Sequence, residues 1–365
     1  MVHSPFILLS LVLFAIPLEA VWKLKNNTYV VDIDMSRRER PIQTVILKCE
    51  ASEKQKNSNI HWEQSLNHDK SNSKSRKTVG YGTEHQAHVN DFLDGGNFTC
   101  RNEKREVLHY SNLLINEIID IRGANSKQIL KEFLDTKTFF YCEAKTYSGN
   151  FTCYWQVTER KEQHEEMVVM QVEEGVRNVV CSHPSLDKKR SIYTTNCQEI
   201  GVCLHGEENQ AITLVLHAIR GRRYENATTS IFIRNIVKPD PPQNLSIFLC
   251  KKSVTLQWEY PESWSTQHTF FPLTFKVRVE ETGKPQKRST HGGSQRKRST
   301  EKVQYYNVDN TSLTLDQWNS RKTYHVQAKD CYGDSFWSNW SSFEHPIHQE
   351  KPGKMKSNVA RERTC

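Results

Sequence analysis

The sequence predicts an all-β protein made of consecutive sandwich domains. Short segments rich in β-branched and aromatic residues alternate apolar and polar positions and recur about every ten residues. Among them are YVVDI (29–33), TVILKCE (44–50), FTCYWQV (151–157) and LTFKVRVE (273–280). No sustained apolar repeat with a helical period of 3.6 residues competes with this pattern. A chain of 365 residues is long enough for two or three such domains.

Residues 1–20 have the features of a signal peptide. The apolar run from Phe6 to Ile16 is too short to span a bilayer, and the small residue Ala20 precedes the expected cleavage before Val21. No later segment contains eighteen consecutive apolar residues. The sequence therefore predicts a secreted protein without a membrane anchor.

The cysteines and the glycosylation sequons agree with an extracellular location. Ten cysteines in an oxidising compartment indicate a disulfide framework rather than catalytic thiols or metal ligands. Seven N-x-S/T sequons are present, and a tightly packed backbone is expected to keep the one at Asn339 unmodified. Glycans are expected on the other six, which are Asn26, Asn97, Asn150, Asn226, Asn244 and Asn310.

The first predicted domain spans residues 21–117. Cys49 is followed by Trp62 thirteen residues later and by Cys100 within DGGNFTC. A cysteine pair that bridges two sheets, with a tryptophan packed against it, is typical of an immunoglobulin-like sandwich. The tyrosine expected two residues before the second cysteine is Phe98, so its corner hydroxyl is absent.

The second predicted domain, residues 118–237, is a fibronectin type III-like sandwich with two disulfides. Cys142 and Cys153 lie on two strands of a predicted hairpin, and Cys181 is expected to pair with Cys197. Each bond is expected to stabilise a domain of this size by about 2 to 4 kcal/mol.

The third predicted domain, residues 238–349, is also fibronectin type III-like and begins with the stiff proline segment KPDPPQNL. It ends with a WSxWS motif formed by Trp337, Ser338, Trp340 and Ser341. We expect the two indole rings to stack over the outer face of the strand YHVQAKD, with Arg278 and Lys329 as the cations of a cation-π ladder. The serines are expected to hold the irregular backbone. Residues 350–365 are expected to form a basic flexible tail.

These motifs together resemble the extracellular part of a class I cytokine receptor. Further segments, including CQEIGVC, SIFIRNIVKPDPPQNL and WEYPESWSTQHTFFPLTF, resemble the family of soluble beta subunits shared by interleukin-12 and interleukin-23. The resemblance covers almost the whole chain after residue 20 except the tail and parts of the basic loop. It implies a secreted, receptor-like protein that pairs with a four-helix-bundle alpha subunit, forming a heterodimeric cytokine that engages a cell-surface cytokine receptor through the immunoglobulin domain. It also implies that Trp337 is a candidate for C-mannosylation.

Sandwich topology predicts that four loops meet at an elbow between the second and third domains. Aromatic rings around a single acid in these loops would form a pocket for a partner cation, with arginine best suited to a desolvated carboxylate. The candidate partner-binding residues are Tyr147, Glu207, Phe270, Phe271, Asp330 and Tyr332. Four of them, Tyr147, Phe270, Asp330 and Tyr332, fall on the family's pocket positions, with Phe270 in place of a tyrosine. A glycan on Asn150 either runs along the outer face of its strand or shields part of this pocket.

Cys203 lies six residues after Cys197, so both cannot bridge Cys181. The family uses the matching position for a disulfide to the helical subunit, and a leftover cysteine in a secreted chain is expected to pair outside it. An unpaired thiol or another internal pair is the alternative. Cys250, Cys331 and Cys365 remain unassigned, because Cys250 and Cys331 are expected at opposite poles of their domain.

The positive charge is concentrated in two segments. Residues 283–302 contain seven Lys or Arg and one acid, and the tail is also basic, whereas the rest of the chain is close to neutral. Capture of heparan sulfate is one reading of the basic loop, and a solvated loop is an equal alternative. The candidate glycosaminoglycan-binding residues are Lys287, Arg288, Arg296, Lys297 and Arg298. A secreted location argues against nucleic acid as the partner.

The sequence contains none of the catalytic motifs G-x-S-x-G, G-x-x-x-x-G-K-S/T or H-E-x-x-H. The pairs His85/His88 and His345/His348 have metal-like spacing, but such pairs on exposed segments are usually solvated. We therefore expect a protein that is not an enzyme and needs no cofactor or metal. The alternative function is an unanchored soluble cytokine receptor or a glycosaminoglycan-binding adhesion protein of the immunoglobulin class.

Overall fold

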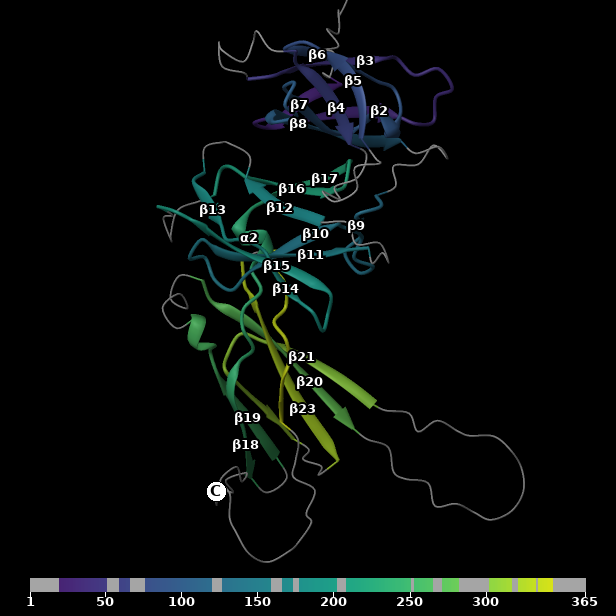
Figure 1. Ribbon diagram of the computed structural model, residues 1–365. Helices are drawn as coiled ribbons and strands as arrows, with labels where there is room; N and C mark the ends of the chain where they lie inside the picture. The colour runs from purple at the N-terminus through teal and green to yellow at the C-terminus, as the bar shows by residue number, and fades with distance from the viewer. Residues whose placement is uncertain are drawn as a thin grey trace, which may run out of the picture. The chain divides into compact units, whose positions relative to one another are not determined.

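The computed structural model (Figure 1) is built almost entirely from β-strands, as the sequence predicts. It describes residues 20–50, 59–65, 76–119, 127–158, 166–172, 177–201, 208–250, 253–264, 271–281, 302–316, 321–332 and 334–343. Within these ranges no helix is long and apolar enough to cross a membrane. The predicted signal peptide, apart from Ala20, and the predicted tail lie outside them.

Backbone contacts divide the chain into two compact units. Unit 1 comprises residues 1–131, 157–168 and 217–226, and unit 2 comprises residues 132–156, 169–216 and 227–365. Strands β12 (Glu166–Val172), β16 (Ile212–Arg220) and β17 (Arg223–Ile231) cross the limits between the units along the chain. The three-domain division predicted from the sequence remains a prediction.

The N-terminal strands of unit 1 form two sheets. One has the order β12-β16-β17-β8-β7-β4-β5, with β2 parallel to β8 and β1 paired to β2, and the other pairs β3 with β6. The elements are β1 (Val21–Lys25), β2 (Thr28–Asp34), β3 (Gln43–Lys48), β4 (His61–Ser65), β5 (Arg76–Tyr81), β6 (Glu84–Val89), the 3-10 turn η2 (Phe92–Asp94), β7 (Gly96–Arg101) and β8 (Val107–Ile119). The short strand β9 (Leu130–Lys131) belongs to neither of these sheets. Burial alternates along β3, where Val45 and Leu47 point inward and their neighbours are exposed or partly exposed.

The immunoglobulin signature forms the core of this part of unit 1. Cys49 and Cys100 form a disulfide, and Trp62 is fully buried in the same cluster. The Trp62 indole donates a hydrogen bond from Nε1 to the Gly82 carbonyl at 3.0 Å. Phe98 is buried in the cluster, so its ring contributes packing without a corner hydroxyl.

A second apolar cluster in unit 1 attaches the β16–β17 turn to β8. Tyr224, Leu114 and Val30 are its buried members. Residues 223 and 224 of β17 pair in parallel with residues 115 and 116 of β8. The Arg223 guanidinium forms a partly buried ion pair with Glu117 at 2.8 Å and lies 4.5 Å from the centre of the Phe92 ring. Apolar packing, backbone pairing and an ion pair together hold the β16–β17 turn against β8.

The first sheet of unit 2 has the order β10-β11-β15-β13, with β14 paired to β15. Its elements are β10 (Phe140–Ala144), β11 (Asn150–Val157), β13 (Val179–Cys181), β14 (Ser185–Asp187) and β15 (Ile192–Glu199), and the helix α2 (Ile233–Ile236) follows β17. Disulfides join Cys142 to Cys153 and Cys181 to Cys197. In each pair, the two cysteines lie directly opposite each other on paired strands. Both bonds therefore staple neighbouring strands of one sheet.

Two further sheets complete unit 2. Their orders are β18-β19-β22 and β21-β20-β23-β24. The elements are β18 (Gln243–Cys250), β19 (Ser253–Glu259), the 3-10 turn η3 (Glu262–Trp264), β20 (Leu273–Glu281), β21 (Lys302–Val308), β22 (Ser312–Leu315), β23 (Lys322–Asp330) and β24 (Ser341–Phe343). Buried residues alternate along β19 and β20, and Trp258 and Phe275 meet edge to face at 5.5 Å. This packing is the expected core of a β-sandwich.

Candidate functional site

Tyr147 lies in the β10–β11 turn and contacts two segments of the C-terminal sheets of unit 2. Its hydroxyl donates a hydrogen bond to Oδ2 of Asp330, the last residue of β23. Its ring stacks on Phe271, with ring centroids 4.3 Å apart, and meets Trp264 edge to face at 6.1 Å. Three of the four loops named in the prediction are in contact here, and the fourth, with Glu207, lies outside the described residues. We call Tyr147, Trp264, Phe271, Asp330 and Tyr332 the elbow cluster.

Trp264 anchors the aromatic side of the elbow cluster, although sequence reasoning did not select it. It ends the short turn η3, is fully buried and donates a hydrogen bond from Nε1 to the Phe271 carbonyl at 2.7 Å. That bond fixes the backbone that carries the ring stacked on Tyr147. The only sequence signal was a tryptophan in a loop otherwise rich in polar residues.

Asp330 is buried, with 1% of its surface exposed, rather than open at the floor of a pocket. Besides the Tyr147 hydroxyl, it accepts a hydrogen bond at Oδ1 from the Tyr332 backbone amide at 3.2 Å. Within the described residues, no Lys or Arg lies at salt-bridge distance from this carboxylate. Both hydrogen-bond donors to the Asp330 carboxylate are therefore neutral groups. Buried carboxylates are usually paired with a cation.

The Tyr147 hydroxyl is held firmly as a donor. Burial raises the pKa of Tyr147 far above its ordinary value, and the hydrogen bond to Asp330 raises it further. The charges of Glu208 and Arg234 also act on this pKa, in opposite directions. Tyr147 therefore stays protonated throughout the physiological range.

The predicted partner-binding residues divide into two groups. The structure brings Tyr147, Phe271 and Asp330 into contact, and Tyr332 lies beside them with its side chain largely exposed. Glu207 and Phe270 lie outside the described residues, and so does Cys203.

The WSxWS motif forms a cation-π ladder, with one difference from the prediction. Arg278 lies over the Trp340 ring at 4.6 Å, as expected, but the cation over Trp337 is Lys276 at 4.2 Å and not Lys329. Lys276 and Arg278 are two residues apart on β20, so they share one face of the strand. Lys329 pairs with Thr274 nearer the strand end, where neither indole lies over it.

The serines of the motif hold its backbone. Ser338 exchanges two hydrogen bonds with Ala328 of β23: its amide donates to the Ala328 carbonyl at 2.7 Å, and its Oγ accepts from the Ala328 amide at 2.9 Å. Ser341 donates from Oγ to the Pro242 carbonyl of the proline segment. On the strand YHVQAKD, His325 and Gln327 are buried, and the His325 ring packs edge to face against Trp340.

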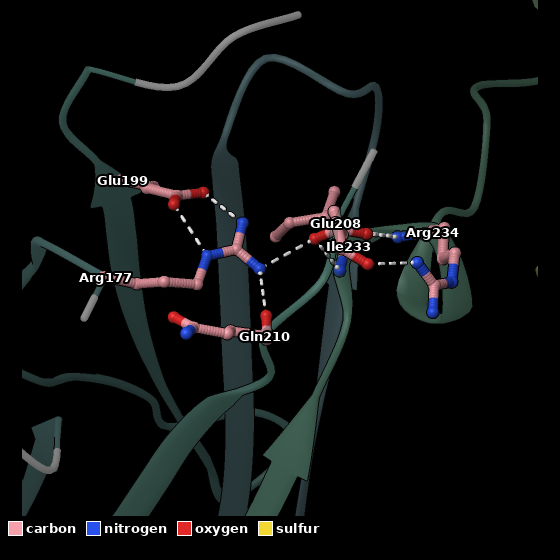
Figure 2. Close-up of polar contacts among 6 residues, drawn as sticks. All are labelled: Arg177, Glu199, Glu208, Gln210, Ile233 and Arg234. Carbon is pink, nitrogen blue, oxygen red and sulfur yellow. Dashed lines mark hydrogen bonds and ion pairs between the residues drawn. The ribbon is translucent and has the colours of Figure 1, made fainter. Parts of the chain in front are cut away.

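A second polar cluster in unit 2 centres on a guanidinium (Figure 2). Arg177 donates to both carboxylate oxygens of Glu199, at 2.6 and 2.5 Å, and to Oε1 of Glu208 at 2.9 Å. Hydrogen bonding to Glu199 raises the pKa of Arg177, although burial acts in the opposite sense. We call this the Arg177 cluster, and its members are Arg177, Glu199, Glu208, Gln210, Ile233 and Arg234. Sequence reasoning missed it, because its charges are far apart along the chain.

The sequons differ in accessibility. Asn26, Asn150, Asn244 and Asn310 are exposed, whereas Asn97 and Asn226 are partly buried. Asn150 lines a groove of about 650 Å³ on the sheet face formed by β10, β11, β15 and β13, together with Thr152, Asn196 and Gln198. A glycan on Asn150 has room along this face. The five candidate glycosaminoglycan-binding residues lie outside the described residues.

No group of three or more potential metal ligands occurs in the described part of the chain. Burial, and then the neighbouring His88, lower the pKa of His85. Cys331 is a free, exposed thiol.

Comparisons with known proteins agree with the resemblance. A family model described as Cytokine interleukin-12p40 C-terminus matches residues 137–220. Interleukin-12 subunit beta of Cervus elaphus is 35% identical over 351 residues, covering 91% of this chain and 95% of the relative. The Felis catus protein of the same name is 36% identical over 346 residues, covering 92% and 96%. The Equus caballus protein is 35% identical over 345 residues, covering 91% and 95%. Because the similarity spans nearly the whole chain, this protein belongs to the interleukin-12 subunit beta family, whose members are cytokine subunits and not enzymes.

Proposed function

We propose that this chain is the secreted beta subunit of a heterodimeric cytokine and binds a four-helix-bundle alpha subunit at the elbow cluster. The name shared by its relatives describes one subunit of a larger assembly. The disulfide-stapled β-sheets support an extracellular role. The paired cytokine would then engage a cell-surface receptor, with the immunoglobulin-like region as a receptor contact.

The buried Asp330 carboxylate carries this proposal. It is held by the hydroxyl of Tyr147 and the amide of Tyr332, with no cation beside it in the described chain. A carboxylate has about four acceptor positions, so two remain for a partner. A cation supplied by a second chain would complete this site.

Arginine is the partner residue that fits best. Its planar fork can donate two parallel hydrogen bonds to one carboxylate, and its face can stack on aromatic rings such as Phe271. Access requires a side-chain movement, and the exposed Tyr332 ring is the group that we expect to rotate. Binding energy tends to concentrate in such central aromatic and charged anchors.

Cys203 would add a covalent bond to this contact. The described cysteines of the same sheet are already paired as Cys142–Cys153 and Cys181–Cys197, so neither bond leaves a sulfur for Cys203. Co-expression with the alpha subunit should yield a heterodimer that survives non-reducing electrophoresis, and Cys203→Ser should abolish it. If the wild-type chain migrates only as a monomer, the soluble-receptor alternative is favoured.

The non-covalent contact is tested in the Cys203→Ser background. Asp330→Ala is expected to weaken alpha-subunit affinity by about 2 to 5 kcal/mol, at least roughly a thirtyfold rise in Kd. Asp330→Asn keeps the shape but removes the charge, so it should lose most of the same affinity. Asp334→Ala is the matched control, because Asp334 is an exposed acid four residues away. Equal affinity of the Asp330 and Asp334 variants in surface plasmon resonance would exclude the elbow as the binding site.

A further inference from the structure

The first sheet of unit 2 carries a groove of about 650 Å³ on one face, formed by β10, β11, β15 and β13. Sites that bind small ligands commonly have volumes of about 300 to 1,000 Å³. Burial alternates along β11, where Phe151 and Cys153 point into the core and Asn150 and Thr152 point to the opposite face. The outward side chains of β11 line the groove, so it lies on the side of the sheet that faces away from the core.

The groove is lined by polar side chains that can hydrogen-bond to sugar hydroxyls. Asn150 lies directly opposite Gln198, and Thr152 lies opposite Asn196. Asn150, Asn196 and Gln198 are exposed. The Thr152 hydroxyl donates a hydrogen bond to Oδ1 of Asn196 at 2.9 Å, so this contact does not use the amide nitrogen of Asn196 as a donor. Side-chain amides both donate and accept hydrogen bonds, as sugar hydroxyls do.

Apolar side chains of the groove are open to water as well. Val180 and Ile200 line it and are 56% and 55% exposed, although both are large hydrophobic residues. The Tyr154 ring lines the same groove and stacks on Tyr141, with ring centroids 5.2 Å apart. A sugar ring has an apolar face of C–H groups, which packs against aromatic and aliphatic side chains. The groove thus combines hydrogen-bonding groups with apolar surface that a ligand would cover.

Asn150 can supply the ligand itself, because it is the acceptor residue of the sequon that Phe151 and Thr152 complete. Its side-chain nitrogen, the atom to which an N-glycan is bonded, donates to Oγ of Ser148 at 3.2 Å, and Ser148 also lines the groove. A glycan on this nitrogen therefore begins at the groove. A strand rises about 3.4 Å per residue, so a sugar chain that follows β11 reaches Tyr154 after about 14 Å.

We propose that Asn150 carries an N-glycan whose first sugars dock in this groove of the same chain. Asn196 and Gln198 hydrogen-bond to the sugars, and Val180 and Ile200 pack against them. Because the glycan is covalently tethered, its effective concentration at the groove is high, and contacts that are individually weak suffice to keep it docked. The docked glycan covers the exposed apolar side chains. This inference does not depend on pairing with an alpha subunit.

The experiment uses the full-length chain secreted from cultured animal cells. Glycopeptide mass spectrometry first measures the glycan occupancy of Asn150. Peptide-N-glycosidase F then releases glycans from the native and from the denatured chain, and the release rate is followed at each site. Asn244 and Asn310 are the reference sites, because both are exposed sequons of unit 2 that do not line the groove. This comparison within the wild-type chain needs no variant.

Only an undocked glycan is accessible to the glycosidase, so docking lowers the release rate by the undocked fraction. In the native chain we expect the Asn150 glycan to be released roughly tenfold more slowly than the reference glycans, and at their rate after denaturation. A double variant, Val180→Ser with Gln198→Ala, should bring the native rate at Asn150 to within about twofold of the references. Gln257→Ala is the matched control and should keep the delay, since Gln257 is an exposed glutamine on β19, outside the groove.

Three results would overturn the proposal. The first is the absence of a glycan at Asn150, and the second is its release from the native chain at the reference rate. The third is a delay that the double variant leaves unchanged, because the fold would then obstruct the glycosidase without any contact between the glycan and the groove.

Discussion

Replacing Tyr147 with phenylalanine tests the elbow cluster within the isolated chain. The substitution removes the hydroxyl that donates to the buried Asp330 carboxylate but keeps the ring that stacks on Phe271 at 4.3 Å. A hydrogen bond to a charged group contributes about 1.5 to 3 kcal/mol. Because the acceptor is almost fully buried, water cannot replace the lost donor without a local opening. We therefore expect a local loss of about 2 kcal/mol.

The suitable measurement is amide hydrogen exchange in the native state, because unfolding of a chain with two compact units is not treated as a single transition. A loss of about 2 kcal/mol corresponds to roughly thirtyfold faster exchange. The effect should centre on peptides that contain the end of β23 and the Tyr332 amide. Tyr305→Phe is the control, since Tyr305 is exposed in the same unit. An exchange rate for Tyr147→Phe within about twofold of the control would refute the reasoning.

Three further outcomes follow from other parts of the molecule. Arg278→Ala removes the cation over Trp340, so it should destabilise this region by about 1 kcal/mol, measured as roughly fivefold faster amide exchange in β20, and no change would contradict the ladder. His217 has its pKa lowered by burial and lies 2.6 Å from the Tyr224 hydroxyl, so the unfolded chain binds its proton first as pH falls. Stability should therefore be lost as pH falls below about 6.5 toward the lower folded pKa, and His217→Gln should reduce that slope in pH-dependent thermal unfolding. Asn150→Gln should leave alpha-subunit affinity within about twofold in surface plasmon resonance, because Asn150 lines the groove on the sheet face; a tenfold gain would show that its glycan shields the elbow.

Local sequence patterns were sufficient to predict the all-β fold class and the disulfides Cys142–Cys153 and Cys181–Cys197 between neighbouring strands. Alternation along segments such as LTFKVRVE sets which side chains point inward, and the structure follows it on β20. The spacing of Cys49, Trp62 and Cys100 placed a disulfide and an indole in one core, where the structure has them. These features depend on neighbouring residues or on a well-known topology, so sequence reasoning can reach them.

Features that depend on exact register were harder to predict. Lys276 and Lys329 are both lysines on neighbouring strands, and only the pairing of β20 with β23 shows which one lies under Trp337. Sequence reasoning placed Tyr147 near Asp330, but as parts of an open pocket, and only the structure shows that the carboxylate is buried and accepts the tyrosine hydroxyl. Arg177 meets carboxylates 22 and 31 residues away, which no local pattern specifies.

The WSxWS motif supports the strand that ends in Asp330. Ser338 makes two hydrogen bonds to the Ala328 backbone, one through its amide and one through its side-chain oxygen. Ala328 lies two residues before Asp330 on the same strand. The motif also reaches the proline segment through Ser341 and Pro242, while its indoles stack on cations of β20. The motif therefore contacts β23, β20 and the proline segment. The buried Asp330 carboxylate needs such support, because its charge favours local opening toward water. WSxWS therefore supports the strand end at which Asp330 accepts the hydrogen bond from the Tyr147 hydroxyl.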